Sequence, residues 1–201
     1  MKHIKPYKIF ESNVSNFPTT RKEVIQVCNR YRIENYSIND DLSIGVDGGV
    51  YLHNLKLEYL PLKFNYVNGN FDCGYNELKT LEGSPQTVSG NFSCYSNELK
   101  SLEGGLQTVG GDFDCYRNEL KDLEHFPEVS GDIDIGHNTV NLLVYTFIKK
   151  ADSFMIEDFI DYEIVRNRDT VMLDRLQTFI RDNDLEMPNL DNIKEHYKII
   201  E

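Results

Sequence analysis

A repeat of about 21 residues occupies the middle of this chain and limits the folds that it can adopt. The segment 69–73, Gly-Asn-Phe-Asp-Cys, recurs almost unchanged at 90–94 and at 111–115. Each copy continues with Asn-Glu-Leu and then with a further leucine three positions on. A degenerate row from Gly48 and a last row up to Val140 extend the pattern to five rows. This period predicts a stack of equivalent coils, because no single row can bury its own apolar side.

The apolar positions within a row predict a short strand with one buried face. Phe71 and Cys73 alternate with Asp72, as the inward and outward side chains of a strand do. Stacking at the spacing of strands in a sheet places the phenylalanines of successive rows in one internal column and the cysteines in another. Asn76 follows the strand, where its amide can satisfy backbone groups of the turn. We expect the thiols to be free, buried core side chains, and neither disulfides nor metal ligands.

The frame of each row, apolar-x-apolar-x-x-Asn-x-Leu, is the second half of the leucine-rich-repeat consensus, and its period lies within the range of those repeats. The sequence therefore predicts an α/β repeat solenoid, that is, a short leucine-rich-repeat stack over residues 48–140. A mixed N-terminal cap is predicted at 1–47 and a helical C-terminal cap at 141–201. In the alternative, the C-terminal region is a separate small domain.

Both flanks carry signals of segments that cover the ends of a stack. Thr20 and Glu23 have the spacing of a capping box at the start of a helix. The segments 36–38 and 42–44 alternate like the strands of a short hairpin, with 39–41 as its turn. After Val140 the apolar spacing becomes helical. It predicts helices near 141–150, 153–161 and 169–182, and a fourth that Asn189 starts after Pro188.

The row Phe-Asp-Cys-Tyr-x-Asn-Glu-Leu-Lys-x-Leu-Glu-Gly, with Tyr-Ser-Ile-Asn-Asp-Asp at 36–41 and Tyr-Lys-Ile-Phe-Glu at 7–11, resembles leucine-rich-repeat proteins encoded by large tailed bacteriophages. The likeness is strongest from about Tyr36 to Val140. It implies a viral accessory protein made in the cytoplasm of a bacterial host and used as a binding scaffold. The chain departs from the longest family members in having only three clean repeats and in placing Leu55 where the asparagine column belongs. We therefore expect a short, flat stack and no deep curvature that encloses a small ligand.

The charge of the chain favours a basic protein as its partner. Lys and Arg number 21 against 33 Asp and Glu, which gives a formal charge of −12. Such a chain does not replace the counterions of a nucleic-acid backbone, so direct binding of nucleic acid is not expected. The sequence predicts neither a secretory signal nor a membrane span, and we expect no membrane association.

The side chains between the buried positions are expected to face outward in columns that run across the rows. Aspartate and tyrosine dominate these columns, and tyrosine supplies a large contact area at low entropic cost. We interpret this face as the binding site for a basic surface of a bacterial protein. The predicted partner-binding residues are Tyr51, Asp72, Tyr75, Tyr95, Asp112, Asp114, Tyr116, Arg117, Asp132, Asp134 and His137. The alternatives are a merely solvated face, self-association, and a bound cation such as calcium, although no recognised calcium loop is present.

The sequence patterns of common enzyme sites do not occur in this chain. Its histidines show no close-spaced ligand pattern, and the nucleophile-elbow and phosphate-loop motifs are missing. We predict a protein that is not an enzyme, uses no cofactor or metal, and exists as a monomer or small homo-oligomer. Its predicted function is to dock on a bacterial host or antiviral-defence protein and inhibit it. The alternatives are an acidic nucleic-acid mimic that occupies a DNA- or RNA-binding enzyme, and a homo-oligomeric structural or virion protein.

Overall fold

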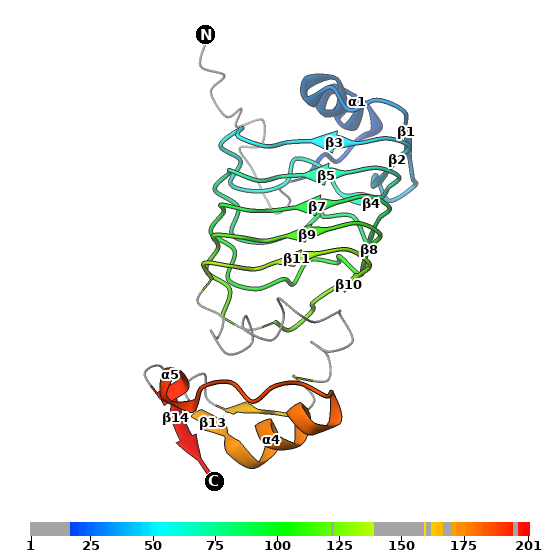
Figure 1. Ribbon diagram of the computed structural model, residues 1–201. Coiled ribbons are helices and arrows are strands. Elements are labelled where there is room, and N and C mark those ends of the chain that lie inside the picture. The colour runs from blue at the N-terminus through cyan, green and yellow to red at the C-terminus, as the bar shows by residue number, and fades with distance from the viewer. Residues whose placement is uncertain (1–16, 122, 139–158, 160–161, 167–169, 195–196) are drawn as a thin grey trace.

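The structure is a computed structural model that describes residues 17–121, 123–138, 159, 162–166, 170–194 and 197–201. Its central part is a β-solenoid of about four stacked coils with a period of about 21 residues (Figure 1). Val50 pairs with Phe71, Phe71 with Phe92, Phe92 with Phe113, and Phe113 with Ile133. The repeat found in the sequence is therefore confirmed as the structural unit.

Each coil contributes one strand to each of two sheets. The first sheet consists of the parallel strands β3 (Val50–Tyr51), β5 (Phe71–Asp72), β7 (Phe92–Ser93), β9 (Phe113–Asp114) and β11 (Ile133–Asp134). The second consists of β1 (Tyr36–Ile38), β2 (Ile44–Val46), β4 (Phe64–Val67), β6 (Thr87–Val88), β8 (Thr108–Val109) and β10 (Glu128–Val129). In the second sheet β1 is antiparallel to β2, and all other neighbours are parallel.

The second strand of each repeat is a finding that goes beyond the sequence prediction, which placed one strand in each row of the repeat. The described residues between 48 and 138 form strands and turns and no helix, so the predicted α/β character of the repeat is not confirmed. The second strand of a coil can be as short as Thr87–Val88. A strand of two residues is too short to show an alternation of buried and exposed side chains in the sequence. Such a strand forms because it pairs with the strands of the neighbouring coils on both sides.

The interior of the stack contains the two predicted columns. The rings of Phe71, Phe92 and Phe113 are fully buried and stack with centroid distances of 5.4 and 5.8 Å. The cysteine column is also buried, its thiols are free, and burial raises the pKa of the Cys94 thiol. The cysteine column comprises Cys73, Cys94 and Cys115, and the buried Leu52 and Ile135 continue it. These side chains are packing residues, as predicted.

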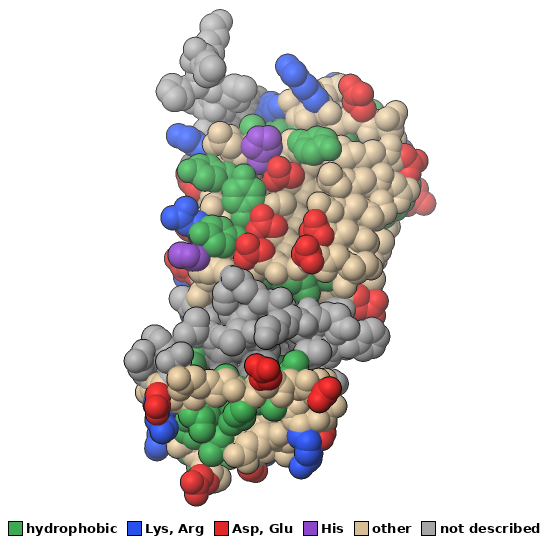
Figure 2. All heavy atoms as spheres, viewed as in Figure 1, with side chains coloured by type: hydrophobic (Ala, Val, Ile, Leu, Met, Phe, Trp, Pro, Cys, Tyr) green, Lys and Arg blue, Asp and Glu red, His purple; other side chains and the backbone are tan. Residues whose placement is uncertain are grey.

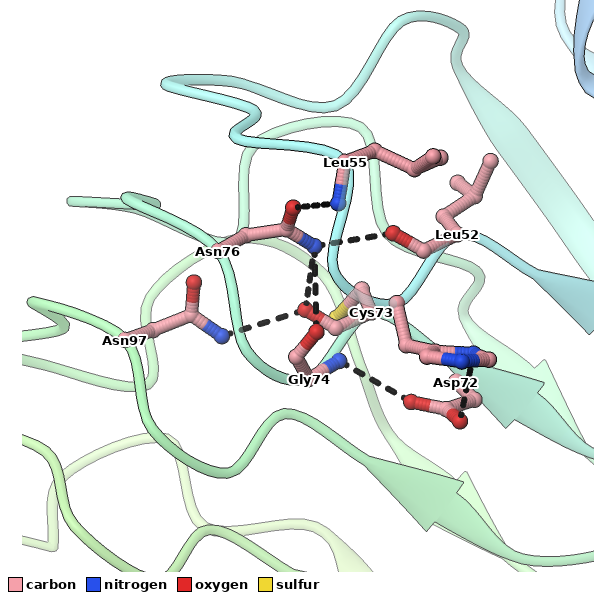
Figure 3. A network of polar contacts seen from close by, with 8 residues as sticks. Leu52, Leu55, Asp72, Cys73, Gly74, Asn76 and Asn97 are labelled. Atoms are coloured by element: carbon pink, nitrogen blue, oxygen red, sulfur yellow. Dashed lines mark hydrogen bonds and ion pairs between the residues drawn. The ribbon is translucent and has the colours of Figure 1, made fainter. Parts of the chain in front are cut away.

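A column of asparagine amides ties each coil to the preceding one. Asn76 donates from Nδ2 to the carbonyls of Leu52 and Cys73 at 2.8 and 2.9 Å, and its Oδ1 accepts the N–H of Leu55 at 2.9 Å (Figure 3). Related bonds recur in later coils at Asn97, Asn118 and Asn138. These backbone groups lie at the turn, where the sheet ladder does not reach them. The role predicted for Asn76 is confirmed.

The N-terminal flank begins with helix α1 (Arg21–Tyr31), which lies at the N-terminal end of the stack (Figure 1). The predicted capping box is present, because Glu23 N–H donates to Thr20 Oγ1 at 3.3 Å and Thr20 N–H donates to Glu23 Oε2 at 3.0 Å. The buried side chains of this helix, Val24 and Cys28, belong to the same hydrophobic core as the coils.

The predicted hairpin is formed by β1 and β2, but its turn is longer than expected. The second strand starts at Ile44 and not at Leu42. The Asp41 carboxylate accepts the N–H and the hydroxyl of Ser43 at 3.1 and 2.7 Å, which draws both residues into the turn. Such side-chain bonds compete locally with strand pairing.

The described part of the C-terminal region contains strands as well as helices. A three-stranded sheet of β12 (Val165–Arg166), β13 (Thr170–Met172) and β14 (Lys198–Ile200) accompanies α4 (Leu173–Asp182) and α5 (Leu190–Lys194). The helix predicted at 169–182 therefore starts only at Leu173, since β13 pairs with both other strands. Asn189 precedes the predicted last helix and accepts the N–H of Asp191 at 2.8 Å. The boundary at 140 and the helix predicted at 141–150 lie outside the described residues, as does all of 153–161 except Phe159.

Candidate functional site

The residues predicted to bind a partner lie together on one side of the stack, on and beside the first sheet. The structure leaves all of them at least partly accessible. Figure 2 shows green and red side chains gathered over these coils, as tyrosines and aspartates are coloured there. We call this set the tyrosine–aspartate surface, and it comprises Tyr51, Asp72, Tyr75, Tyr95, Asp112, Asp114, Tyr116, Arg117, Asp132, Asp134 and His137.

The aromatic part of the surface contains two pairs of rings that are in contact between successive coils. Tyr51 and Tyr75 are 60% and 59% exposed. The rings of Tyr75 and Tyr95 meet edge to face at 6.3 Å, and those of Tyr116 and His137 at 4.9 Å. Rings that are held by such contacts lose little further freedom when a partner covers them.

Gly74 makes room for one of these rings. A Cβ at this position would lie 2.3 Å from Cε1 of Tyr95, so the Tyr95 ring lies directly over the glycine backbone. The next coil thus covers the place where its neighbour has no side chain. The sequence column that contains both residues gives no sign of this contact, because it arises only from stacking.

One corner of the coils keeps exposed side chains in a strained conformation. Tyr75, Ser96, Arg117 and His137 occupy equivalent positions and have φ values of 57°, 51°, 55° and 55°. The left-handed region costs a residue with a Cβ about 1–2 kcal/mol. The backbone of this corner is nevertheless hydrogen-bonded to the next coil, since Tyr75 N–H donates to the Tyr95 carbonyl at 2.8 Å. This corner retains tyrosine, arginine and histidine where glycine would be less strained.

The aspartates at the strand ends shape the backbone as well as carrying charge. Asp72 accepts the N–H of Gly74 at 3.0 Å, Asp114 that of Tyr116 at 3.0 Å, and Asp134 that of Gly136 at 2.8 Å. Figure 3 shows the first of these bonds. One oxygen of each carboxylate is therefore used within the fold, a role that the sequence analysis missed.

Asp112 belongs to a second polar ladder at the corner before the strands. Its Oδ1 accepts the N–H of Asp132 at 2.9 Å, and its Oδ2 accepts a bond from Asn91 Nδ2 at 3.2 Å. Asn91 in turn accepts the N–H of Asp112 at 3.0 Å. Both oxygens of Asp112, which is exposed, thus accept bonds from neighbouring coils, which makes Asp114 and Asp134 the better candidates for contact with a partner.

The carboxylate column is electrostatically unfavourable at its centre. Burial raises the pKa of Asp114, and the charges of Asp134 and Asp72 raise it further. Tyr95 lies beside the same charges, and its pKa is raised by burial and then by Asp72 and Asp114. In this column His53 Nδ1 lies 3.4 Å from Asp72 Oδ2. No described Lys or Arg lies within salt-bridge distance of Asp114, Asp132 or Asp134.

A different side of the coils carries a charge ladder that neutralises itself. Lys79 Nζ lies 4.0 Å from Glu98 Oε2, and Lys100 Nζ lies 3.8 Å from Glu119 Oε2. These side chains are exposed, and pairs of this kind add little stability. On this solvated side of the repeat each Lys side chain of the two pairs lies beside a Glu side chain of opposite charge. The tyrosine–aspartate surface lacks that balance.

Three residues outside the predicted set belong to the surface by contact. His53 pairs with Asp72, Ser93 hydrogen-bonds to the Asp114 side chain, and Gly74 lies beneath Tyr95. His53 and Ser93 occupy the same columns of the repeat as predicted residues, so their position in the repeat could have identified them as part of the surface. Their contacts depend on residues one coil away.

We expect Asp114→Asn to stabilise the protein at neutral pH. The asparagine Oδ1 still accepts the N–H of Tyr116, while the unfavourable charge is removed. Because the folded pKa of Asp114 is raised, the wild-type chain gains stability as pH falls through that pKa. The gain in melting temperature of the variant should therefore be present at neutral pH and shrink towards about pH 3, where the wild-type carboxyl is protonated.

Thermal unfolding followed by circular dichroism measures this difference. Glu98→Gln is the matched control, because it removes an exposed charge that has Lys79 at 4.0 Å. The control should show no gain at neutral pH. A lower melting temperature for Asp114→Asn at neutral pH would show that the ionised form of Asp114 stabilises the fold.

The chemistry available at this surface is that of contact and charge. Among the described residues, no group of three or more His, Cys, Asp or Glu side chains is arranged to hold a metal ion. No helix in the described part of the chain combines the length and apolar character that crossing a membrane requires. The fold is a β-solenoid, and tyrosine and aspartate side chains lie accessible on one side of it.

Comparisons with known proteins find no match. No protein-family model matches the chain, and the searches of curated proteins and of solved structures likewise return no match.

Proposed function

We propose that this protein is a non-catalytic binding module whose tyrosine–aspartate surface docks on a basic surface of another protein. The observation that carries the proposal is the half-buried Asp114, with the acidic Asp134 in the next coil and Asp72 two coils away, beside tyrosines that are at least partly exposed. Tyrosine is enriched where protein interfaces gain most of their energy. The Lys–Glu ladder elsewhere on the coils offers no comparable unbalanced charge.

The charge arrangement supports a partner with cationic groups. A Lys or Arg side chain placed near Asp114 and Asp134 would relieve the repulsion between their carboxylates. Binding sites commonly keep groups that cost the free protein stability. Association would be steered by long-range charge and would weaken as salt screens it.

The biological setting is part of the proposal. The resemblance of the rows to phage-encoded leucine-rich-repeat proteins supports a viral origin and action in the cytoplasm of a bacterial host. The target is then a host or antiviral-defence protein that the docked module inhibits, with the module acting as a monomer or small homo-oligomer. We further propose that α1 with the β1–β2 hairpin, and the C-terminal region, cover the two ends of the stack. Val24 and Cys28 of α1, which share the core of the coils, support the first of these roles.

Capture of a target from bacterial cells tests the proposal. The full chain is immobilised beside a surface variant, Asp114→Asn with Asp134→Asn, which keeps the acceptors for Tyr116 and Gly136. A control, Glu98→Gln with Glu119→Gln, removes the same charge from the Lys–Glu ladder. We expect the wild type and the control to enrich the same host protein at low salt, and the surface variant to lose about tenfold or more of it. Equal enrichment by all three proteins would place the site elsewhere.

An acidic mimic of a nucleic acid is the second candidate. The observation that favours it is the alignment of carboxylates along the stack, with Asp112 bonded to Asp132 and Asp114 in register with Asp134. A DNA- or RNA-binding enzyme would be its target. Added duplex should then displace the captured target, whereas a target held through an unrelated basic surface should stay bound.

A further inference from the structure

Tyrosine rings and aspartate carboxylates lie side by side on this surface, and this arrangement favours one kind of cationic group on a partner over another. The tyrosine column runs beside the aspartate column, because the side chain two positions past a strand-end aspartate lies on the same face. Asp114 and Tyr116 have this relation directly. Tyr95 lies over Gly74, and the charges of Asp72 and Asp114 both raise its pKa. A group that binds Asp114 therefore has aromatic faces within reach.

The chain itself shows how one cation is accommodated here. Cζ of Arg117 lies 5.8 Å from the ring centroid of Tyr116, which is a cation–π contact. The Tyr116 ring also meets His137 edge to face at 4.9 Å. A planar guanidinium can thus lie against a tyrosine ring of this surface.

Guanidinium and ammonium groups differ in the interactions that they make with such a surface. A guanidinium stacks on an aromatic ring while its N–H groups bind a carboxylate in two-fold fashion. An ammonium is a compact, strongly hydrated charge that gains chiefly from the carboxylate. A surface that offers both rings and carboxylates therefore discriminates in favour of arginine.

A metal ion is a poorer fit to the same residues. One oxygen each of Asp72, Asp114 and Asp134 accepts a backbone N–H. Among the described side chains, no cluster is arranged as a metal site. The exposed rings would also contribute nothing to a hard cation that prefers oxygen ligands.

We infer that the tyrosine–aspartate surface recognises a protein segment that carries exposed arginines, with guanidinium groups stacked on the Tyr95 and Tyr116 rings and paired with Asp114 and Asp134. This inference rests on the proposed function and specifies the chemistry of the partner. It predicts a preference that a purely electrostatic surface does not have. Arginine should bind more tightly than lysine at equal charge.

Two labelled peptides of equal length, hexa-arginine and hexa-lysine, test this preference by fluorescence anisotropy with the full chain at low salt. We expect hexa-arginine to bind about fivefold more tightly. Replacing both rings, Tyr95→Leu with Tyr116→Leu, should remove that preference and leave the affinity for hexa-lysine nearly unchanged. Asp114→Asn with Asp134→Asn should weaken both peptides, and Glu98→Gln with Glu119→Gln should weaken neither.

The outcomes separate this inference from the proposed function. If both peptides bind equally well and the aspartate variant weakens both, recognition of arginine is wrong while docking on a basic surface stands. If neither peptide binds, or if the aspartate variant binds as the wild type does, both are wrong. Thermal melts verify that the ring variant is folded, and the single variant Tyr116→Leu replaces it if it is not. Retained preference for hexa-arginine in the folded ring variant would also overturn the inference.

Discussion

Replacing Asn118 with leucine is expected to lower the free energy of unfolding by about 2–4 kcal/mol. The Asn118 side chain is buried and makes three bonds to the backbone. Its Nδ2 donates to the carbonyls of Cys94 and Cys115 at 3.0 and 3.1 Å, and its Oδ1 accepts the N–H of Leu99 at 3.1 Å. The carbonyls keep Asn97 and Asn138 as donors, so the largest loss is the Leu99 N–H, which would be buried without a partner.

Urea unfolding followed by circular dichroism measures this loss. Asn65→Leu, at an exposed position of β4, is the matched control and should change the free energy of unfolding by less than about 0.5 kcal/mol. Asn118→Asp keeps the shape of the side chain but removes its N–H donors, so that a carboxylate faces the two carbonyl oxygens. That variant should be least stable at neutral pH and recover in acid, where a protonated carboxyl can donate again. A wild-type midpoint for Asn118→Leu would mean that the amide column adds nothing to the stability of the stack.

Phe92→Ala is expected to cost about 3–5 kcal/mol, the other large effect in this molecule. The Phe92 ring is fully buried between Phe71 and Phe113, with interplanar angles of 8° and 9°. Neighbouring coils are held by ladder bonds on both sides, so the stack cannot collapse freely into the space left by the ring. The cavity therefore adds to the lost burial of the ring.

Comparison with an exposed ring isolates the role of the core. Tyr75→Ala removes an aromatic side chain that is 59% exposed, and it should shift the unfolding midpoint only slightly. If Phe92→Ala does not fold, Phe92→Leu should give a smaller loss, because leucine leaves a smaller cavity. Equal losses for Phe92→Ala and Tyr75→Ala would contradict the buried phenylalanine column.

Features that depend on nearby residues or on the period were predictable. The capping box needs only Thr20 and Glu23, three residues apart, and it forms as expected. The buried phenylalanines and cysteines follow from two-residue alternation repeated in successive rows. The outward position of the tyrosine–aspartate surface follows from the same alternation.

Features that depend on pairing between distant segments could not be predicted from the sequence. Strands such as β6 and β8 have two residues each, and their existence rests on the coil above and the coil below. The sheet of β12, β13 and β14 joins residues 165–172 to 198–200, and it displaced the expected start of a helix. Intrinsic propensity is a weak guide where such pairing competes with it.

The sequence by itself determined the period, the identity of the buried columns and the side of the coil that faces outward. These follow from the order of apolar and polar residues along one row. Only the tertiary structure decided which outward groups are used within the fold, as the bonds of Asp112 show. The physical reason is that the partners come from other coils: Asn76 reaches residues 19 and 24 positions away, and Tyr95 covers a glycine of the preceding coil.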